Sequence, residues 1–202
     1  MQFEQSHLYH IYNRGNNSQR IFFNRDNYLF FLDKIRKNIL PYADILAWCL
    51  MPTHFHLMLH VNNVDIEFDE KMMPVSTHWV TPSHPVSKSR TLNSSIAILL
   101  RSYTRAIQKQ EKRTGYLFQM QTKAICLTQI DGISSSWFQT SFGAVINISD
   151  SEKEYPQICF DYIHANPVRD GLVKCQEDWD YAGSRNGKLI NRDRAKEFGL
   201  IY

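Results

Sequence analysis

The chain has 202 residues, of which 43% are hydrophobic and 21% are charged, and its formal net charge is +3 at pH 7. This balance is typical of a folded globular domain and excludes a largely disordered or fibrous chain. No apolar run approaches the roughly 18 to 20 residues of a membrane-spanning helix, and residues 1–5 lack the pattern of a signal peptide. We therefore expect one domain over residues 1–202, with a cytoplasmic location and no membrane partner.

Basic residues gather in one part of the chain. Residues 94–124 contain six basic side chains and one acidic side chain, whereas residues 153–202 contain eight of each sign. A net charge of +3 is too small to indicate a nucleic-acid partner by itself. The uneven distribution makes residues 94–124 the first candidate for contact with phosphates.

The first two elements are a strand and a helix. Residues 7–13 alternate and are rich in Tyr and Ile, which predicts a strand. In residues 24–40 the apolar side chains recur with a period near 3.6, which predicts a helix. Asn24 or Asp26 can cap its start, and Pro41 ends it.

Two adjacent apolar segments predict a strand hairpin. Residues 44–51 form a continuous apolar run, as expected of a strand that is buried on both faces. Residues 54–61 alternate, so their side chains divide between two faces. One face carries Phe55, Leu57, Leu59 and Val61, and the other carries His54, His56, Met58 and His60.

The second half of the chain is less regular. We predict a loop insertion at 62–93, which holds three prolines and an acidic patch within residues 65–70. Residues 94–112 predict a helix with one apolar and one basic stripe, and residues 116–127 predict a strand. The stretch 128–150 is assigned no regular structure and is treated as a second insertion.

A last helix is predicted over residues 151–165. Pro167 disfavours helical backbone at the residue before it and is therefore expected to stop this helix. The order is then strand, helix, strand, strand, helix, strand and a further helix. The first six elements match the split β-α-β pattern of the ferredoxin-like fold. We therefore expect an α+β fold with an antiparallel sheet, helices on one face, and a C-terminal helix that carries a tyrosine.

The pair His54 and His56 is a candidate metal site. Two histidines spaced two apart on a strand point to the same side, where both imidazoles can reach one divalent ion. Phe55 between them points into the core. His60 lies on the same face but too far along the strand to share the ion easily. The alternative is a metal-free pair of half-buried histidines.

Tyr162 and Asn166 are the second candidate pair. They are four residues apart on the predicted last helix and therefore share a face. An amide oxygen is a suitable ligand for Mg²⁺ or Mn²⁺. A phenol is a poor nucleophile at neutral pH because its pKa is near 10, but a nearby metal ion can help by polarising the phosphate that the phenol attacks. The alternative is a core aromatic residue followed by an ordinary helix stop at Asn166-Pro167.

Five segments of the chain resemble, in the same order, the single-tyrosine HUH transposases, and in particular the REP-associated tyrosine transposases. The resemblance covers residues from about 7 to 173. The segments are YNRGNN at 12–17, CLMPTHFHL at 49–57, SYT at 102–104, GYLFQ at 115–119 and YIHANPVRDGLV at 162–173.

The resemblance implies an enzyme that cuts and rejoins single-stranded or hairpin DNA, as in transposition or mobilisation of REP-like hairpin elements. His54, His56 and Asn166 would hold Mg²⁺ or Mn²⁺, and Tyr162 would be the nucleophile that forms a 5′-phosphotyrosine intermediate. Tyr103 is a rival phenol. Two alternatives are a DNA-binding protein of the same fold that no longer cuts, and an unrelated metalloenzyme that uses a carboxylate of the 65–70 patch.

Basic residues are assigned to DNA binding. Four of them recur along one flank of the helix at 94–112, although a solvated helix face would look the same. Arg14 follows the first strand and could contact DNA close to the metal, and Lys123 is a weaker candidate. The four helical residues are Arg101, Arg105, Lys109 and Lys112.

Three features leave questions open. Unpaired bases could stack on Tyr12, Tyr116 or Phe118, or these rings could belong to the core. The chain has no basic residue directly after GYLFQ, and the stretch 128–150 has no counterpart in the resemblance. The sequence also leaves open whether one chain builds the site or a homodimer shares it.

Overall fold

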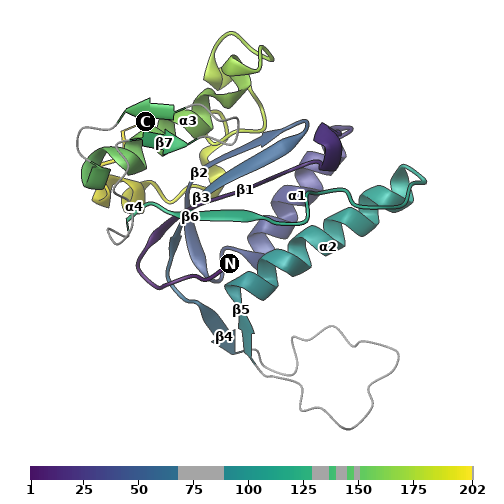
Figure 1. Cartoon of the computed structure of the whole chain (residues 1–202), viewed down its shortest axis with the longest axis horizontal. Coiled ribbons are helices and arrows are strands. Elements are labelled where there is room, and N and C mark those ends of the chain that lie inside the picture. Colours follow the sequence, from purple (N-terminus) through teal and green to yellow (C-terminus); the bar gives the residue numbers. More distant parts are fainter. Residues whose placement is uncertain (68–88, 129–136, 140–144, 148–150, 202) are drawn as a thin grey trace.

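A four-stranded antiparallel sheet is the centre of this computed structural model, which describes residues 1–67, 89–128, 137–139, 145–147 and 151–201, with the backbone alone for 137–139, 145–147 and 151–154. The strand order is β2-β3-β1-β6. This is the order of the split β-α-β pattern, so the predicted ferredoxin-like fold is confirmed (Figure 1). The strands are β1 (Leu8–Arg14), β2 (Ala43–Met51), β3 (His54–Val61) and β6 (Lys123–Cys126).

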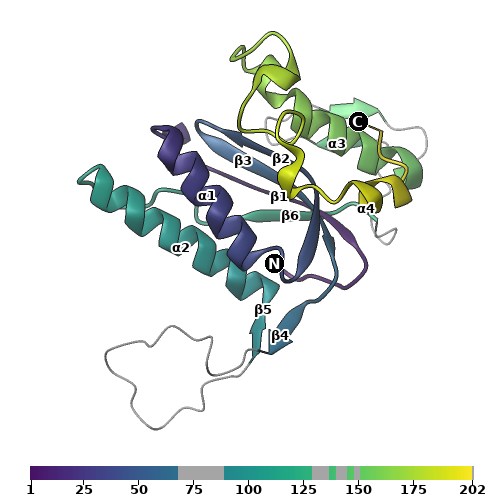
Figure 2. The same cartoon turned by 180° about the vertical axis from the view of Figure 1, so that it is seen from behind.

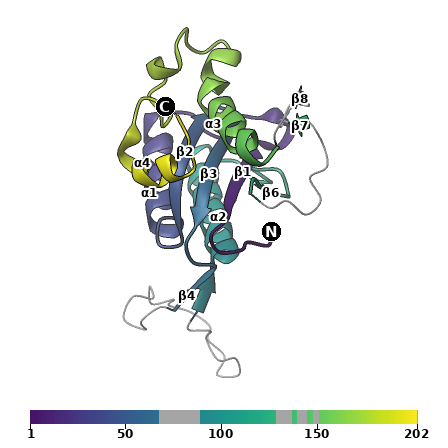
Figure 3. The same cartoon turned by 90° about the vertical axis from the view of Figure 1, so that its left-hand side faces the viewer.

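Helices cover both faces of the sheet. The helices α1 (Arg25–Asn38) and α2 (Leu92–Gln110) pack together on one face, and α3 (Ser151–Arg169) packs on the other face against β2 and β3 (Figures 1 and 3). The short helix α4 (Arg192–Glu197) contacts β2. The fold therefore has the expected pair of helices on one face, with the tyrosine-bearing helix on the opposite face.

Local capping explains where α1 and α2 begin. The side chain of Asn24 accepts a hydrogen bond from the backbone N–H of Asn27, and the side chain of Asn27 accepts one from the backbone N–H of Asn24. The side chain of Thr91 caps α2 by accepting from the N–H of Ser94. Both helices then bury one apolar stripe, as their 3.6-residue period predicts.

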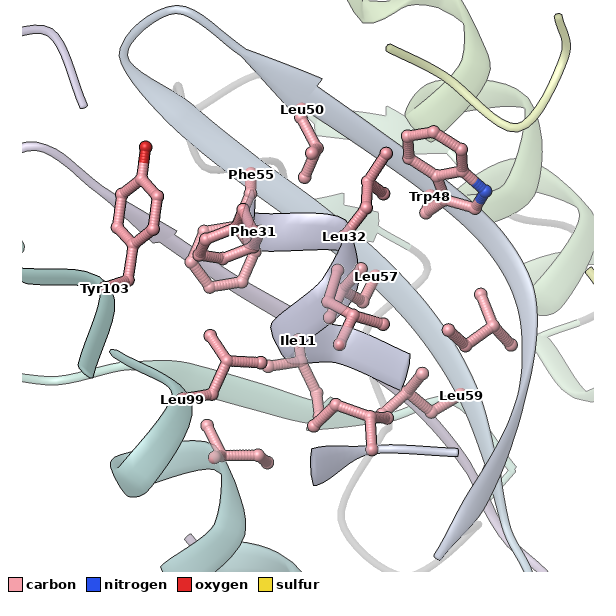
Figure 4. Packing of buried hydrophobic residues seen from close by; sticks show 14 of the residues in the cluster. Ile11, Phe31, Leu32, Trp48, Leu50, Phe55, Leu57, Leu59, Leu99 and Tyr103 are labelled. Atoms are coloured by element: carbon pink, nitrogen blue, oxygen red, sulfur yellow. The ribbon is translucent and has the colours of Figure 1, made fainter. Parts of the chain in front are cut away.

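The α1/α2 face of the sheet holds the larger hydrophobic cluster (Figure 4). Phe55 from β3 packs against Phe31 of α1, with ring centroids 5.2 Å apart, and Phe31 meets Tyr103 of α2 edge to face at 4.9 Å. The buried hydroxyl of Tyr103 donates a hydrogen bond to the carbonyl oxygen of Ile21 at 2.7 Å. Tyr103 is thus a packing residue and lies on the face opposite α3.

The predicted stop of the last helix at Pro167 is wrong, because α3 continues to Arg169. A proline inside a helix removes a single N–H donor, here the one that would bond to the carbonyl of Ile163. The helical pattern resumes directly afterwards, since the N–H of Asp170 donates to the carbonyl of Asn166 at 3.0 Å. The helix ends instead after Arg169. Gly171 follows two residues later with a φ of +70°, a backbone conformation that favours glycine.

The predicted strand at 116–127 is also too long. Only β6 pairs with β1, and residues 116–122 cross the end of β1 without a ladder. The side chain of Asn13 takes over part of the pairing there, donating to the carbonyl of Gln119 and to the hydroxyl of Thr122. A side chain therefore satisfies groups that a longer β6 would have paired through its backbone.

Each of the two predicted insertions contains one pair of short antiparallel strands. β4 (Asp65–Glu67) pairs with β5 (Ser89–Thr91) inside the 62–93 insertion, and this hairpin projects from one end of the sheet (Figure 2). β7 (Trp137–Gln139) pairs with β8 (Val145–Asn147) inside the 128–150 insertion. Residues 68–88 and the remainder of 129–150 lie outside the described residues.

The C-terminal segment after α3 covers the edge strand β2. The N–H of Leu50 donates to the carbonyl of Tyr181 at 2.9 Å, and the N–H of Gly183 donates to the carbonyl of Trp48 at 2.8 Å. An edge strand that is covered in this way does not offer its backbone to other chains. Within the described part of the chain, single 3₁₀ turns lie at Asn16–Ser18, Gln176–Asp178 and Gly187–Leu189. Within the described ranges, no helix is both long and apolar enough to cross a membrane.

Candidate active site

The two histidines of β3 lie on the α3 face of the sheet, as their alternation with apolar residues predicts. Both are buried, with 3% of His54 and none of His56 exposed to solvent. The register with β1 places Tyr12 opposite His56 and Arg14 opposite His54. The histidines therefore belong to the two central strands, where neighbouring backbones hold their positions.

A tight connection between β2 and β3 fixes His54 further. The carbonyls of Pro52 and Thr53 accept hydrogen bonds from Ile21 at 2.8 Å and from Gly15 at 2.7 Å, respectively. A Cβ atom at Gly15 would lie 2.0 Å from the carbonyl oxygen of Gln19, so only glycine fits. The hydroxyl of Thr53 lies 3.0 Å from Nδ1 of His54, which orients that imidazole at the start of β3.

A third histidine, His10 on β1, contacts His56. Its Nε2 atom lies 2.9 Å from Nδ1 of His56, and the two rings stack with centroids 5.0 Å apart. Burial lowers the pKa of His10 to about 3, and burial together with His10 and His54 lowers that of His56 well below its ordinary value. The sequence analysis missed this residue, although His10 shares a face with Tyr12 in the alternating strand.

Helix α3 brings Tyr162 and Asn166 to the histidines. The rings of Tyr162 and His56 meet edge to face with centroids 5.4 Å apart, and only 3% of Tyr162 is exposed. The side-chain Nδ2 of Asn166 donates to the carbonyl of Tyr162 at 2.7 Å, which leaves its Oδ1 as the acceptor. One chain thus brings together the imidazole pair, the helical amide and the phenol.

Charged groups at the C-terminal end of α3 complete the surroundings. Burial is the main cause that lowers the pKa of His54, and the guanidinium of Arg14 lowers it further. The carboxylate of Asp170 and a hydrogen bond with Asn166 act in the opposite direction and raise it. The guanidinium of Arg169 lies over the ring of Tyr162, 5.1 Å from its centroid. The buried site therefore opens to charged groups at its rim.

A second phenol, Tyr12, lies beside the same histidines. Its ring centroid is 4.8 Å from that of His10 and 5.7 Å from that of His56. Burial and then the proximity of Tyr162 and Cys159 raise the pKa of Tyr12. Tyr12 is half-buried in this aromatic cluster, so part of its ring packs within the protein.

The donors at this site suit a hard divalent ion. Nε2 of His56 is buried and makes no hydrogen bond to any described residue, so its lone pair is available to a ligand. The ring of His54 lies 5.1 Å from that of His56, measured between centroids, and Asn166 forms a hydrogen bond with His54. Two imidazoles with an amide oxygen suit Mg²⁺ or Mn²⁺. No cluster of three or more His, Cys, Asp or Glu residues suited to a metal occurs among the described residues.

The acidic 65–70 patch lies away from the histidines. Asp65 and Glu67 follow the far end of β3, and the strand spans roughly 23 Å from His54 to Val61 at about 3.3 Å per residue. Asp69 and Glu70 lie outside the described residues. His60 also lies toward this end, where its Nδ1 is 3.0 Å from the side-chain oxygen of Asn62, in agreement with a structural role.

The predicted DNA-binding residues fall into two groups. Arg14 and Lys123 lie near the histidines, since Arg14 pairs with His54 and Lys123 pairs with Tyr12 across the sheet. The other four are exposed. Three lie on α2, which covers the opposite face of the sheet, whereas Lys112 follows the end of α2 at Gln110, so the helix predicted to residue 112 is two residues too long at this end. The members of this α2 group are Arg101, Arg105, Lys109 and Lys112.

A groove of about 1040 Å³ runs between α2 and residues 115–122. Its lining includes Arg101 and Arg105 but no acidic residue, and Tyr116 at its wall is 70% exposed. Phe118 also lines it, but that ring is buried and packs near Phe55 and Tyr103. Of the predicted stacking residues, Tyr116 alone is largely open to solvent.

Comparisons with known proteins give one informative similarity. No protein-family model matches the chain, and no curated protein matches its sequence. Among solved structures, the chain is similar to that of a REP-associated tyrosine transposase bound to a REP hairpin. The TM-score is 0.52 at 15% sequence identity, covering 100% of this chain and 86% of the other. The two proteins therefore share a fold, including the antiparallel sheet and the layers of helices around it.

Proposed function

We propose that this protein is a transposase-type enzyme that cuts and rejoins single-stranded DNA through Tyr162. The observation that carries the proposal is the contact between the rings of Tyr162 and His56, which joins a helical phenol to the histidine pair of β3. The shared fold with a REP-associated tyrosine transposase and the five sequence segments support the same function.

We propose that His54, His56 and Asn166 hold one Mg²⁺ or Mn²⁺ ion. When bound, such an ion polarises a phosphate and stabilises the charge that develops during its displacement. The burial of both imidazoles keeps them neutral, because it lowers their pKa values, and neutral imidazoles have the lone pairs that a ligand needs. Because Nδ2 of Asn166 donates to the carbonyl of Tyr162 in its own helix, the amide oxygen is left to accept, and Asn166 also forms a hydrogen bond with His54.

The reaction is an in-line displacement at phosphorus. The phenol oxygen of Tyr162 forms a bond to the phosphorus, and the bond from phosphorus to the 3′-oxygen of the preceding nucleotide breaks. The phenol loses one proton and the leaving 3′-oxygen gains one, which yields a 5′-phosphotyrosine and a free 3′-hydroxyl. Attack by a second 3′-hydroxyl reverses these changes and joins two strands, so no nucleotide cofactor is needed.

Two arginine side chains can stabilise negative charge in this reaction. Arg169 lies over the ring of Tyr162 and stabilises the phenolate that attacks. Arg14 lies next to His54 and can contact a DNA phosphate at the mouth of the site. Both side chains reach the site from its rim, where DNA would approach the buried phenol.

DNA is the partner that the charge distribution favours. The groove beside α2 presents Arg101 and Arg105 without an acidic neighbour in its lining, together with an exposed tyrosine on which a base can stack. We propose that hairpin or single-stranded DNA lies across this groove and reaches the histidines past Lys123, at the edge of the sheet. In this proposal the α2 group contributes to the affinity for DNA, and the residues on the α3 face carry out the cleavage reaction.

The test is incubation with labelled, hairpin-bearing single-stranded DNA and Mn²⁺, read as a protein-linked band on a denaturing gel. The proposed function predicts a covalent adduct that requires the ion and disappears in His54→Ala and His56→Ala. DNA binding without any adduct, across a panel of hairpins and flanking sequences, would favour the alternative of a DNA-binding protein that no longer cuts.

A further inference from the structure

Gln19 is a polar side chain that the proposed mechanism does not use, and it lies beside the loop at 115–119. This loop forms one wall of the groove next to α2. Its Leu117 and Phe118 side chains are buried, whereas Tyr116 is 70% exposed. The ring of Tyr116 is therefore presented to solvent by a loop whose next two side chains are anchored in the core.

The Gln19 side chain binds the backbone of this loop. Its Nε2 atom donates to the carbonyl of Tyr116 at 2.8 Å and to that of Leu117 at 2.9 Å. Its Oε1 atom accepts a hydrogen bond from Nη2 of Arg113, which precedes the loop. The backbone N–H of Asn16 also donates to the carbonyl of Leu117, at 3.0 Å. Donors from residues 16 and 19 thus hold a loop that has no strand ladder to hold it.

The partners of Gln19 fix which way its amide points. A guanidinium only donates hydrogen bonds, and a carbonyl oxygen only accepts them. A flipped amide would direct its NH₂ group at Arg113 and its oxygen at the two carbonyls, and both contacts would be repulsive. Because a single orientation satisfies every partner, removing this amide takes the same donor away from two backbone carbonyls.

The chain around Gln19 is also tied to the candidate metal site. The backbone N–H groups of Gly15 and Ile21 donate to the carbonyls of Thr53 and Pro52, in the turn that precedes His54. Gln19 lies between Gly15 and Ile21 in the sequence. The short segment 15–21 therefore links the position of the Tyr116 loop to that of the turn before His54.

We propose that Gln19 is a positioning residue that holds Tyr116 in place to stack on an unpaired base of DNA in the groove, at a fixed position relative to His54. The inference rests on the proposed function and deepens it. A loop that is held before DNA binds avoids the free-energy cost of ordering it during binding. The ligand is single-stranded DNA, because an unpaired base can offer its face to an aromatic ring whatever its sequence.

The hold on the loop can be measured without DNA or metal. Gln19→Met has nearly the same length but no N–H to donate to the two carbonyls. The reporter is the backbone N–H of Gln119, which donates to the carbonyl of Arg14 at 2.9 Å. In hydrogen–deuterium exchange followed by mass spectrometry, we expect the peptides covering 115–119 to exchange about 10-fold faster in Gln19→Met than in wild type.

The consequence for DNA is tested by fluorescence anisotropy with hairpin-bearing single-stranded DNA in EDTA, where no ion supports cleavage. We expect the affinity to fall about 10-fold in Tyr116→Ala and about 3- to 10-fold in Gln19→Met. Adding Gln19→Met to Tyr116→Ala should cause no further loss, because Gln19 acts through that ring. A merely structural role would weaken binding in both backgrounds.

Gln110→Met is the matched control. Gln110 is exposed at the end of α2, outside the lining of the groove, and its amide contacts the side chains of Asn27 and Glu111. The exchange of the 115–119 peptides and the affinity for DNA should both stay at the wild-type values in this variant.

The outcomes separate the inference from the proposed function. Wild-type exchange in Gln19→Met would overturn the positioning role, as would equal effects of Gln110→Met or a further loss of affinity in the double variant. If Gln19→Met does not fold, an unchanged affinity in Tyr116→Ala would still overturn it. A wild-type protein that meets these expectations but forms no covalent adduct would contradict the proposed function and leave the role of Gln19 supported.

Discussion

The two faces of β3 show how one strand serves two purposes. On the α1/α2 face, its side chains are Phe55, Leu57, Leu59 and Val61, and they pack into the larger hydrophobic cluster. On the α3 face, the alternate side chains are His54, His56, Met58 and His60, and three of these four are buried imidazoles. Both sets are removed from water, but the first set is entirely apolar, whereas Met58 is the one side chain of the second set that gains the free energy of burying apolar surface.

Burying polar groups has a cost, and among the side chains of β3 this cost falls on the α3 face. A buried polar group has to be hydrogen-bonded or it lowers the stability of the fold. His54 and His56 each have a hydrogen-bonding neighbour at Nδ1, namely Thr53 and His10. The Nε2 atom of His56 has none among the described side chains. The fold tolerates this cost because the opposite face of the same strand supplies stability.

The sharpest way to test this contrast is to remove the proposed nucleophile. Tyr162→Phe deletes one oxygen atom on the α3 face and should lower covalent DNA adduct formation by at least about 10³-fold, because no bond to phosphorus can form there. DNA binding, measured by gel shift, should persist. Tyr103→Phe is the matched control from the α1/α2 face, and it should form the adduct at the wild-type rate. An undiminished adduct band in Tyr162→Phe would contradict the assignment.

A substitution on the α1/α2 face should lower the stability of the fold and leave adduct formation nearly unchanged. Phe31 is fully buried and meets the rings of Phe22, Phe55 and Tyr103. Phe31→Ala should lower the free energy of unfolding by about 3–5 kcal/mol, measured by urea denaturation. The adduct that remains per folded molecule should be close to wild type at low temperature. A large loss of adduct in fully folded Phe31→Ala would show that the two faces are not separate in function.

Acid should destabilise the protein through the α3 face. Burial lowers the pKa of His10 to about 3 and that of His164 to about 4, with Glu177 opposing the latter shift. Below about pH 6.5 the unfolded chain binds protons that the folded chain does not, so stability falls as pH decreases. Each of these histidines should contribute about 1.4 kcal/mol per pH unit between about pH 6 and pH 4.5.

Urea denaturation in EDTA at several pH values measures this slope without interference from a metal. His164→Gln should make the slope shallower by about one proton, because it removes one of the buried histidines. Stability that does not change between pH 6.5 and pH 5 would show that these imidazoles are protonated in the folded protein, which conflicts with their burial.

The smallest expected effect concerns the α2 group. Arg101→Ala combined with Arg105→Ala removes two exposed cations from the groove, so the affinity for single-stranded DNA should become less dependent on salt. The slope of log affinity against log salt should decrease by about 0.7 for each phosphate that the protein no longer neutralises. Fluorescence anisotropy from 50 to 200 mM NaCl measures it. Lys34→Ala, an exchange of a cation on α1 that lies over Phe30, is the control and should leave the slope unchanged.

Sequence patterns identified most of the candidate site because its residues lie in regular elements. His54 and His56 follow a strict alternation, and Tyr162 and Asn166 are one helical turn apart. The pattern failed at Pro167, where we expected a helix end that the structure does not have. It failed again at residues 116–122, because the Asn13 side chain replaces a ladder that no local pattern predicts.

The sequence by itself determined the two faces of β3 and the shared face of Tyr162 and Asn166, because strand and helix periods are local properties of the chain. Only the tertiary structure decided which of these faces meet. It brought His10 to His56 across 46 residues, put the ring of Tyr162 against that of His56, and placed the α2 group on the opposite side of the sheet. Contacts of this kind depend on strand order and on the packing of helices across the whole sheet, which no short stretch of sequence contains.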